Sequence, residues 1–266
     1  IPGKLAGMMW PLETIVLGIA MTMTPFVSSE QAIALEPFVS TFIHDFFSAI
    51  WSFTYNGIRG NLRNVIKAIR TRNGKFIILA AIIGGPVGMT GYVLSINNLG
   101  ASIGAMASAI YPAIGAVLAY FFLKERMQWY RWIFLIMTLL GVYGLSYSPE
   151  INISNFWAGF AGTLMCAFGW GIEAVILAKS MQNSEITDEI ALQIRQTTSS
   201  MIHGTIILPL MKGWGFTVSL FRETRRGILL IALAALFATI SYLFYYKAIK
   251  QIGASKAMAL NVSYAA

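Results

Sequence analysis

The segments WPLETIVL (residues 10–17) and WGIEAVIL (residues 170–177) decide the fold, because they read as two copies of one apolar helix. Tryptophan, glutamate and leucine recur at the same three positions, as the pairs Trp10/Trp170, Glu13/Glu173 and Leu17/Leu177. A carboxylate in the middle of an apolar helix, with no basic residue close by, is unusual in any class of protein. Its presence twice, in the same context, calls for an explanation from the rest of the chain.

A second pair of similar segments shows that the duplication extends beyond one helix. LSINNLGASIGAMASAIYPA (residues 94–113) aligns without gaps to KAIKQIGASKAMALNVSYAA (residues 247–266). The identical pairs are Ile96/Ile249, Gly100/Gly253, Ala101/Ala254, Ser102/Ser255, Tyr111/Tyr264 and Ala113/Ala266, and the same register pairs Tyr92 with Tyr245. Self-similarity over such a long interval indicates that the chain contains an internal repeat.

The composition places the chain in a membrane. Of its 266 residues, 57% are hydrophobic and 11% are charged, and the mean hydropathy is +0.67. A soluble domain carries roughly 25% charged residues, so this chain has too few to cover a water-facing surface. The net charge of +8 is divided among short clusters between apolar runs, without the basic and aromatic pattern of a nucleic-acid-binding protein.

Nine stretches are candidates for membrane-spanning helices, each judged against the ~20 apolar residues that a bilayer requires. Their approximate ranges are 5–24, 38–56, 76–96, 101–123, 129–147, 155–178, 190–211, 227–246 and one that starts near 254. The ninth is cut short by the end of the sequence. We therefore predict an all-α integral membrane protein.

The repeat determines how these helices are organised. Helices one to four match helices six to nine, which predicts a ten-helix fold of two five-helix units, residues 1–150 and 151–266, with helix ten absent from this sequence. Because five is an odd number, successive units enter the membrane from opposite sides. Inverted repeats of this kind are typical of secondary transporters, whose substrate sites lie near the bilayer midplane between the repeats.

The distribution of basic residues predicts the orientation. The most basic loop, residues 59–75, belongs on the cytoplasmic side of the cell membrane by the positive-inside rule, which also places the N-terminus in the cytoplasm. Most of the other basic clusters agree with this orientation. The segment 212–226 disagrees, because its basic residues would then lie outside.

Ionisable side chains inside the predicted helices are candidates for a functional site. Glu13, Asp45, Glu173 and Arg195 lie well inside helices, and His44 adjoins Asp45. Three carboxylates against one guanidinium favour a cationic solute or protons as a coupling ion. Two structural alternatives remain open: Glu173 could simply pair with Arg195, and the His44–Asp45 pair could be a local hydrogen-bonded element rather than a proton relay.

Aromatic residues accompany the two glutamates. Trp10 and Trp170 precede Glu13 and Glu173 by one helical turn and share a helix face with them. Four matched tyrosines and one asparagine complete the predicted substrate site: Tyr92, Tyr111, Tyr245, Tyr264 and Asn261. Aromatic cages of this kind bind quaternary ammonium groups, whereas the alternative is that these rings only pack between helices or form interface belts.

Glycines in the third predicted helix favour close packing and movement between helices. Gly84, Gly85 and Gly88 flank Pro86 in this segment, and small residues allow helix backbones to approach closely. We expect a flexible segment at this point.

The segment SAIYPAIGAVLAYFFLKERM (residues 108–127) resembles the end of helix four and the following loop in the EamA domain of the drug/metabolite transporter superfamily. Shorter segments resemble the bacterial choline-uptake branch of that family: HDFFS (44–48), GPVGM (85–89), AIYPAI (109–114), IRQTTS (194–199), ISYLFYYKAI (240–249) and LNVSY (260–264). The resemblance implies ten helices in two inverted units. It also implies uptake of choline, bound at Trp10, Trp170, Glu173, Tyr245 and Tyr264. Glu13 departs from the branch and raises the question of a different amine.

The sequence leaves other functions open. An exporter of amino acids or other metabolites is the alternative within the same superfamily. A membrane enzyme or sensor is a third interpretation, but we find no nucleophile–base pair, metal-ligand set or phosphate-binding loop, and we expect neither catalysis nor a cofactor. The sequence leaves open whether the protein forms a homodimer.

Overall fold

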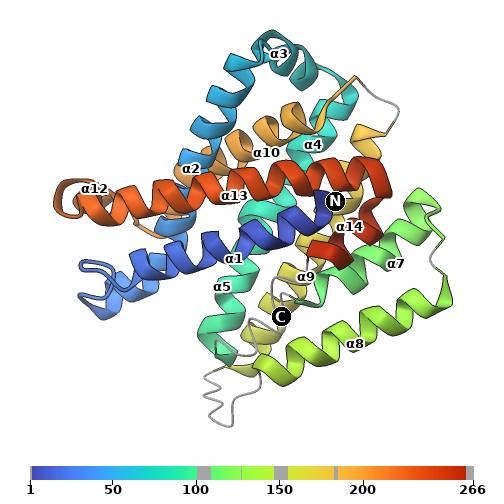
Figure 1. Ribbon diagram of the computed structural model, residues 1–266. Helices are drawn as coiled ribbons and strands as arrows, with labels where there is room; N and C mark the ends of the chain where they lie inside the picture. The colour runs from blue at the N-terminus through green and yellow to red at the C-terminus, as the bar shows by residue number, and fades with distance from the viewer. Residues whose placement is uncertain (1, 101–108, 127, 147–154, 183–184, 262–266) are drawn as a thin grey trace.

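The computed structural model describes residues 2–100, 109–126, 128–146, 155–182 and 185–261, and the regular elements among them are all helical (Figure 1). In chain order the elements are α1 (Pro2–Met21), α2 (Glu30–Ile58), α3 (Leu62–Arg70), α4 (Arg72–Ile82), η1 (Ile83–Val87), α5 (Gly88–Leu99), α7 (Tyr111–Leu123), α8 (Trp129–Ser146), α9 (Phe156–Met181), α10 (Asp188–Ile202), η2 (His203–Ile207), α11 (Leu208–Leu210), α12 (Trp214–Glu223), α13 (Arg225–Ile252) and α14 (Ala254–Asn261). The two segments η1 and η2 are π-helical turns inside longer helices.

Several of these helices are long and apolar enough to cross a bilayer. Within the described residues, α1, α2, the continuous segment Arg72–Leu99, α9 and α13 meet both requirements. The segment Asp188–Leu210 followed by α12 is a sixth candidate, bent by 112°. The apolar helix α7 is shorter than a full span. The prediction of an all-α integral membrane fold is confirmed.

The outer surface of the bundle is apolar, as contact with lipid requires. Phe121, Phe134 and Leu140 are 61 to 70% exposed. The buried core between α4, α9, α10, α13 and α14 instead contains Leu192, Met258 and many alanines. Small side chains in this core allow the helices to approach closely, which is the usual basis of packing between membrane helices.

Two helix predictions were wrong, both in segments that were expected to be loops with several basic residues. Residues 62–70, which we expected to be loop, form α3, because Val65 and Ala68 lie three residues apart and pack inward while the basic residues face out. The segment after residue 211 was also expected to be loop. It forms α12, on which Thr217 and Leu220 are buried at the same spacing.

The bounds of the second helix differ from the prediction at its beginning. α2 begins at Glu30 rather than near residue 38, because the hydroxyl of Ser29 accepts the backbone N–H of Ala32 and caps the helix eight residues earlier. Pro37 follows within the helix without ending it. Residues 101–108, the predicted first half of helix four, lie outside the described residues.

The matched glycines of the repeat have the same structural role. Gly100 follows α5 with φ of 91°, and Gly253 follows α13 with φ of 86°. Positive φ strains residues that carry a Cβ, so glycine is favoured where a helix ends in this conformation. The repeated Gly-Ala-Ser sequence therefore marks the end of a long helix in both halves of the chain.

The main helix pairs join one half of the chain to the other. α1 packs along α13, as Figure 1 shows, and α5 packs along α9. α2 packs against α10, and α7 against α14. Numbered as predicted helices, α1–α13 is helix one with helix eight, and α5–α9 is helix three with helix six. The pair α2–α10 is helix two with helix seven, and α7–α14 is helix four with helix nine. If each helix is replaced by its counterpart in the other predicted unit, the same four pairs result.

A carboxylate from the α7–α8 connection holds the start of α14. Glu125 accepts hydrogen bonds from the backbone N–H groups of Ala254 and Ser255 and from the Ser255 hydroxyl, at 2.7 to 3.1 Å. A hollow at the same junction is lined largely by polar and charged side chains, including Arg126 and Lys256. We interpret this region as a polar joint between helices rather than as the solute site.

Candidate functional site

A small cavity lies between the two halves of the bundle, where α1, α7, α9, α13 and α14 meet. Its lining residues are Trp10, Tyr111, Trp170, Glu173, Ala174, Leu177, Tyr242, Tyr245, Tyr246 and Asn261. The cavity volume is about 60 Å³. Six of the nine residues predicted to bind substrate line this cavity: Trp10, Tyr111, Trp170, Glu173, Tyr245 and Asn261.

The rings around the cavity contact one another mostly edge to face. The Trp10 and Tyr242 ring centroids lie 5.3 Å apart at 74°, and those of Tyr111 and Trp170 lie 5.8 Å apart at 87°. These contacts hold two rings from each half of the chain in place. The face of an aromatic ring is electron-rich, so a cavity lined by several aromatic residues is suited to a cation.

Glu173 is the carboxylate of the cavity, and it is already paired. Its Oε1 lies 2.9 Å from Nε of Arg195, which donates a hydrogen bond to it. The Arg195 guanidinium also lies over the ring of Tyr242, 5.2 Å from the ring centroid. Both side chains are buried, at 6% and 11% exposure, so Arg195 stays inside the bundle. An internal cation therefore occupies the place beside the cavity where a solute cation would be balanced.

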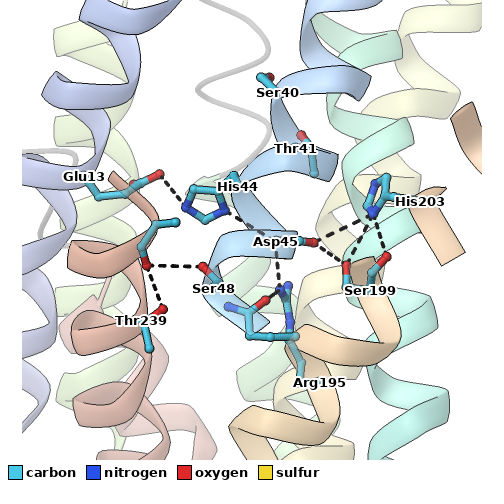
Figure 2. A network of polar contacts seen from close by, with 12 residues as sticks. Glu13, Ser40, Thr41, His44, Asp45, Ser48, Arg195, Ser199, His203 and Thr239 are labelled. Carbon is cyan, nitrogen blue, oxygen red and sulfur yellow. Dashed lines mark hydrogen bonds and ion pairs between the residues drawn. The ribbon is translucent and has the colours of Figure 1, made fainter. Parts of the chain in front are cut away.

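A chain of ionisable side chains extends from Arg195 through Asp45 and His44 to Glu13, as Figure 2 shows. Nη1 of Arg195 lies 3.8 Å from Oδ1 of Asp45, and the same oxygen lies 3.4 Å from Nδ1 of His44. Nε2 of His44 lies 3.5 Å from Oε1 of Glu13. We call Glu13, His44, Asp45, Arg195 and Glu173 the ion-pair chain. It connects α1, α2, α10 and α9, and all five of its members were sequence candidates.

Asp45 is the most connected member of this chain. Ser199 donates its hydroxyl to Oδ2 of Asp45 at 2.5 Å, and Nδ1 of His203 lies 3.8 Å from the same oxygen (Figure 2). His203 also contacts the carbonyl oxygen of Ser199 at 3.0 Å. Charge-assisted hydrogen bonds of this kind stabilise a buried carboxylate that would otherwise be costly.

Glycines in η1 and at the start of α5 make room for the site. A methyl group on them would overlap a neighbouring side chain in each case: Gly84 with Glu173, Gly85 with Ser199, and Gly88 with Trp170. The indole N–H of Trp170 also donates to the carbonyl oxygen of Gly84 at 2.9 Å, within the π-helical turn. The close packing that was expected of this segment is therefore present, and π-helical turns often occur at functional sites.

Two predicted binding residues do not line the cavity, and a third lies outside the described residues. Glu13 pairs with His44 instead, so the two matched glutamates have different surroundings. Tyr92 packs behind the cage, with its ring centroid 5.7 Å from that of Trp170. Tyr264 lies outside the described residues.

The sequence interpretation assigned no role to two lining rings and two polar partners. Tyr242 and Tyr246 lie three residues before and one residue after Tyr245 on the same helix, so helical spacing from Tyr245 could have found Tyr242. Ser199 and His203 follow Arg195 at intervals of four residues, which places all three on one face of a helix. This four-residue spacing can be recognised from the sequence alone.

Comparison with known proteins identifies the family. Residues 8–147, more than half of the chain, match the EamA-like transporter family. The chain is also 29% identical over 188 residues to Protein LicB of Haemophilus influenzae, an alignment that covers 70% of this chain and 62% of LicB. The chain thus spans less than two thirds of the length of this relative. From the family match, we conclude that the chain belongs to the EamA-like transporter family.

Proposed function

We propose that this protein is a secondary transporter that takes up choline or a related small quaternary amine by alternating access. The observation that carries the proposal is the cavity itself, where Trp10, Trp170, Tyr242 and Tyr245 surround a space bordered by the carboxylate of Glu173. A quaternary ammonium group has no N–H to donate, so aromatic faces and a nearby negative charge are the chemistry that recognises it.

The energetic argument favours a cation over a neutral solute. A ring that faces a desolvated cation contributes about 2 kcal/mol, and several rings line this cavity. The small volume of the cavity argues against a large solute. The resemblance of six segments to the choline-uptake branch supports choline among such solutes, and it also supports inward transport.

The packing of the helices supports an inverted repeat as the basis of alternating access. The pairs α1–α13 and α5–α9 are related by exchange of the predicted units, and the cavity lies where these units meet. Movement of one unit against the other would expose such a cavity first on one side of the membrane and then on the other. In this proposal the protein lies in the cell membrane with its N-terminus in the cytoplasm, and it does not act as an enzyme.

The ion-pair chain supports protons as the coupling ion. It begins at the cavity with Glu173 and ends at Glu13, and it contains an imidazole that can accept or donate a proton. Arrays of carboxylate and histidine inside a membrane are typical of proton relays. Entry of a solute cation would disturb the Glu173–Arg195 pair and thereby the rest of the chain.

The experiment is a thermal-shift titration of the purified full-length protein with choline. We expect choline to stabilise the wild type, and Glu173→Gln to weaken this stabilisation strongly. Glu30→Gln, at the exposed start of α2, is the matched control and should respond as the wild type does. Stabilisation by amino acids but not by choline or small quaternary amines would overturn the proposal and favour a metabolite exporter.

A further inference from the structure

Two buried polar atoms, on residues that line the cavity, have no hydrogen-bond partner among the described residues. They are the side-chain oxygen Oδ1 of Asn261 and the phenolic oxygen of Tyr246. Asn261 is 5% exposed and Tyr246 is 1% exposed, and both residues line the cavity. Most buried polar groups in proteins have a partner, so two exceptions in one small cavity call for an explanation.

The orientation of Asn261 follows from its other hydrogen bond. Its Nδ2 donates to the hydroxyl of Tyr111 at 3.1 Å, which joins the end of α14 to the start of α7. This bond uses the amide nitrogen and leaves the carbonyl oxygen as a free acceptor. Asn261, one of the residues that line the cavity, therefore keeps an unpartnered acceptor whose orientation is set by Tyr111.

Tyr246 supplies the complementary group. Its ring is held by edge-to-face contacts with Tyr242 and Tyr245, at centroid distances of 6.2 and 6.1 Å. Its hydroxyl can donate one hydrogen bond and accept others. A single alcohol group could donate to Asn261 and accept from Tyr246, which would satisfy both atoms at once.

We propose that Asn261 and Tyr246 form a subsite for a hydroxyl group, so that the preferred solute is a small cationic amino alcohol. This inference rests on the proposed function, because it assumes that Glu173 and the rings hold the ammonium group of the same molecule. A carboxylate in place of the alcohol cannot donate to Asn261, and it would add negative charge close to Glu173. The subsite therefore discriminates against betaine and against amino acids.

The test compares choline with propyltrimethylammonium, in which a methyl group replaces the hydroxyl, and with betaine, which carries a carboxylate. Equilibrium binding to the full-length protein in detergent measures each affinity. Loss of a buried hydrogen-bond partner should weaken propyltrimethylammonium about 10- to 100-fold relative to choline. Betaine should bind more weakly still.

Two variants test whether Asn261 and Tyr246 cause the preference for choline over propyltrimethylammonium. Tyr246→Phe and Asn261→Leu should each reduce the ratio between choline and propyltrimethylammonium several-fold, while propyltrimethylammonium itself binds about as well as to the wild type. Tyr120→Phe, on the exposed face of α7, is the control that removes a hydroxyl far from the cavity and should keep the wild-type ratio. Tyr246→Phe removes one atom, so a wild-type melting temperature would show that its fold is intact.

The outcomes separate this inference from the proposed function. Equal binding of choline and propyltrimethylammonium to the wild type would overturn the hydroxyl subsite while supporting the aromatic cage. A wild-type preference that persists unchanged in both variants would also overturn it. Binding of neither compound would overturn the proposed function, and the subsite with it.

Discussion

Nε of Arg195 lies 2.9 Å from Oε1 of Glu173, and Nη1 of the same guanidinium lies 3.8 Å from Oδ1 of Asp45. One internal cation thus stands between two buried carboxylates, one at the cavity and one outside it. A solute cation that enters the cage must compete with Arg195 for Glu173. Asp45 is the group to which Arg195 can turn when that happens.

The Arg195–Glu173 pair should be strongly coupled in stability. Arg195→Gln alone should lower the free energy of unfolding by about 3–5 kcal/mol, because it leaves a buried carboxylate without its partner. The double variant Arg195→Gln/Glu173→Gln should recover much of this loss. Unfolding of all variants in mixed micelles with increasing SDS would measure the coupling, and additive effects of the two substitutions would contradict it.

Trp10 should contribute to solute binding through its ring. Trp10→Leu should weaken choline binding about 30-fold, which corresponds to the ~2 kcal/mol of one desolvated cation–π contact. Trp157→Leu is the matched control, because Trp157 is 74% exposed and lies away from the cavity. Calorimetric titration would measure both affinities, and equal losses in the two variants would argue against a specific role for Trp10.

Gly84 should be required for the position of Glu173. Gly84→Ala places a methyl group where Glu173 Oε2 lies, so we expect choline binding to fall as far as it does in Glu173→Gln. Gly18→Ala on α1 has open space around the new methyl group and should leave binding unchanged. The same binding assay tests both variants, and a Gly84→Ala protein with wild-type affinity would disprove this account of the packing at Gly84.

Glu13 should affect coupling more than binding. Because it does not line the cavity, Glu13→Gln should keep the choline affinity within about twofold. Because it ends the ion-pair chain beside His44, the same variant should reduce proton movement that accompanies choline uptake. Proteoliposomes that contain a pH-sensitive dye would report this flux. A variant that binds choline tenfold more weakly, with proton flux in proportion, would place Glu13 in the binding site instead.

The fold class and most of the cage were predictable because they follow from local patterns. Apolar runs of about 20 residues predicted the spans, and the repeated Trp-x-x-Glu spacing predicted that Trp170 and Glu173 share a helix face. Tyr245 followed from the repeat and from resemblance, and Asn261 from its place one helical turn before Tyr264. These signals lie within single helices or in matched positions, so they do not depend on how the side chains pack between helices.

The different surroundings of the two glutamates were not predictable from the repeat. Sequence symmetry predicted that Glu13 and Glu173 would both face the cavity, yet Glu13 pairs with His44 on α2. The position of each glutamate side chain depends on which neighbouring helix leaves room for its carboxylate. That is a property of contacts between segments that are distant in the sequence. Ser199 and His203 were missed for the same reason, since their importance derives from their contact with Asp45.

The two halves of the chain differ at the glycines that pack against Glu173 and Trp170. In the register that pairs Tyr92 with Tyr245, the counterpart of Gly84 is Phe237 and that of Gly88 is Ser241. Only one half of the chain therefore keeps a space for the glutamate of the other half. Replacing Gly84 with phenylalanine and Gly88 with serine, the residue types at the matched positions, would remove that space. In the predicted repeat, the two halves are therefore not interchangeable, because the residues that accommodate Glu173 occur in one half only.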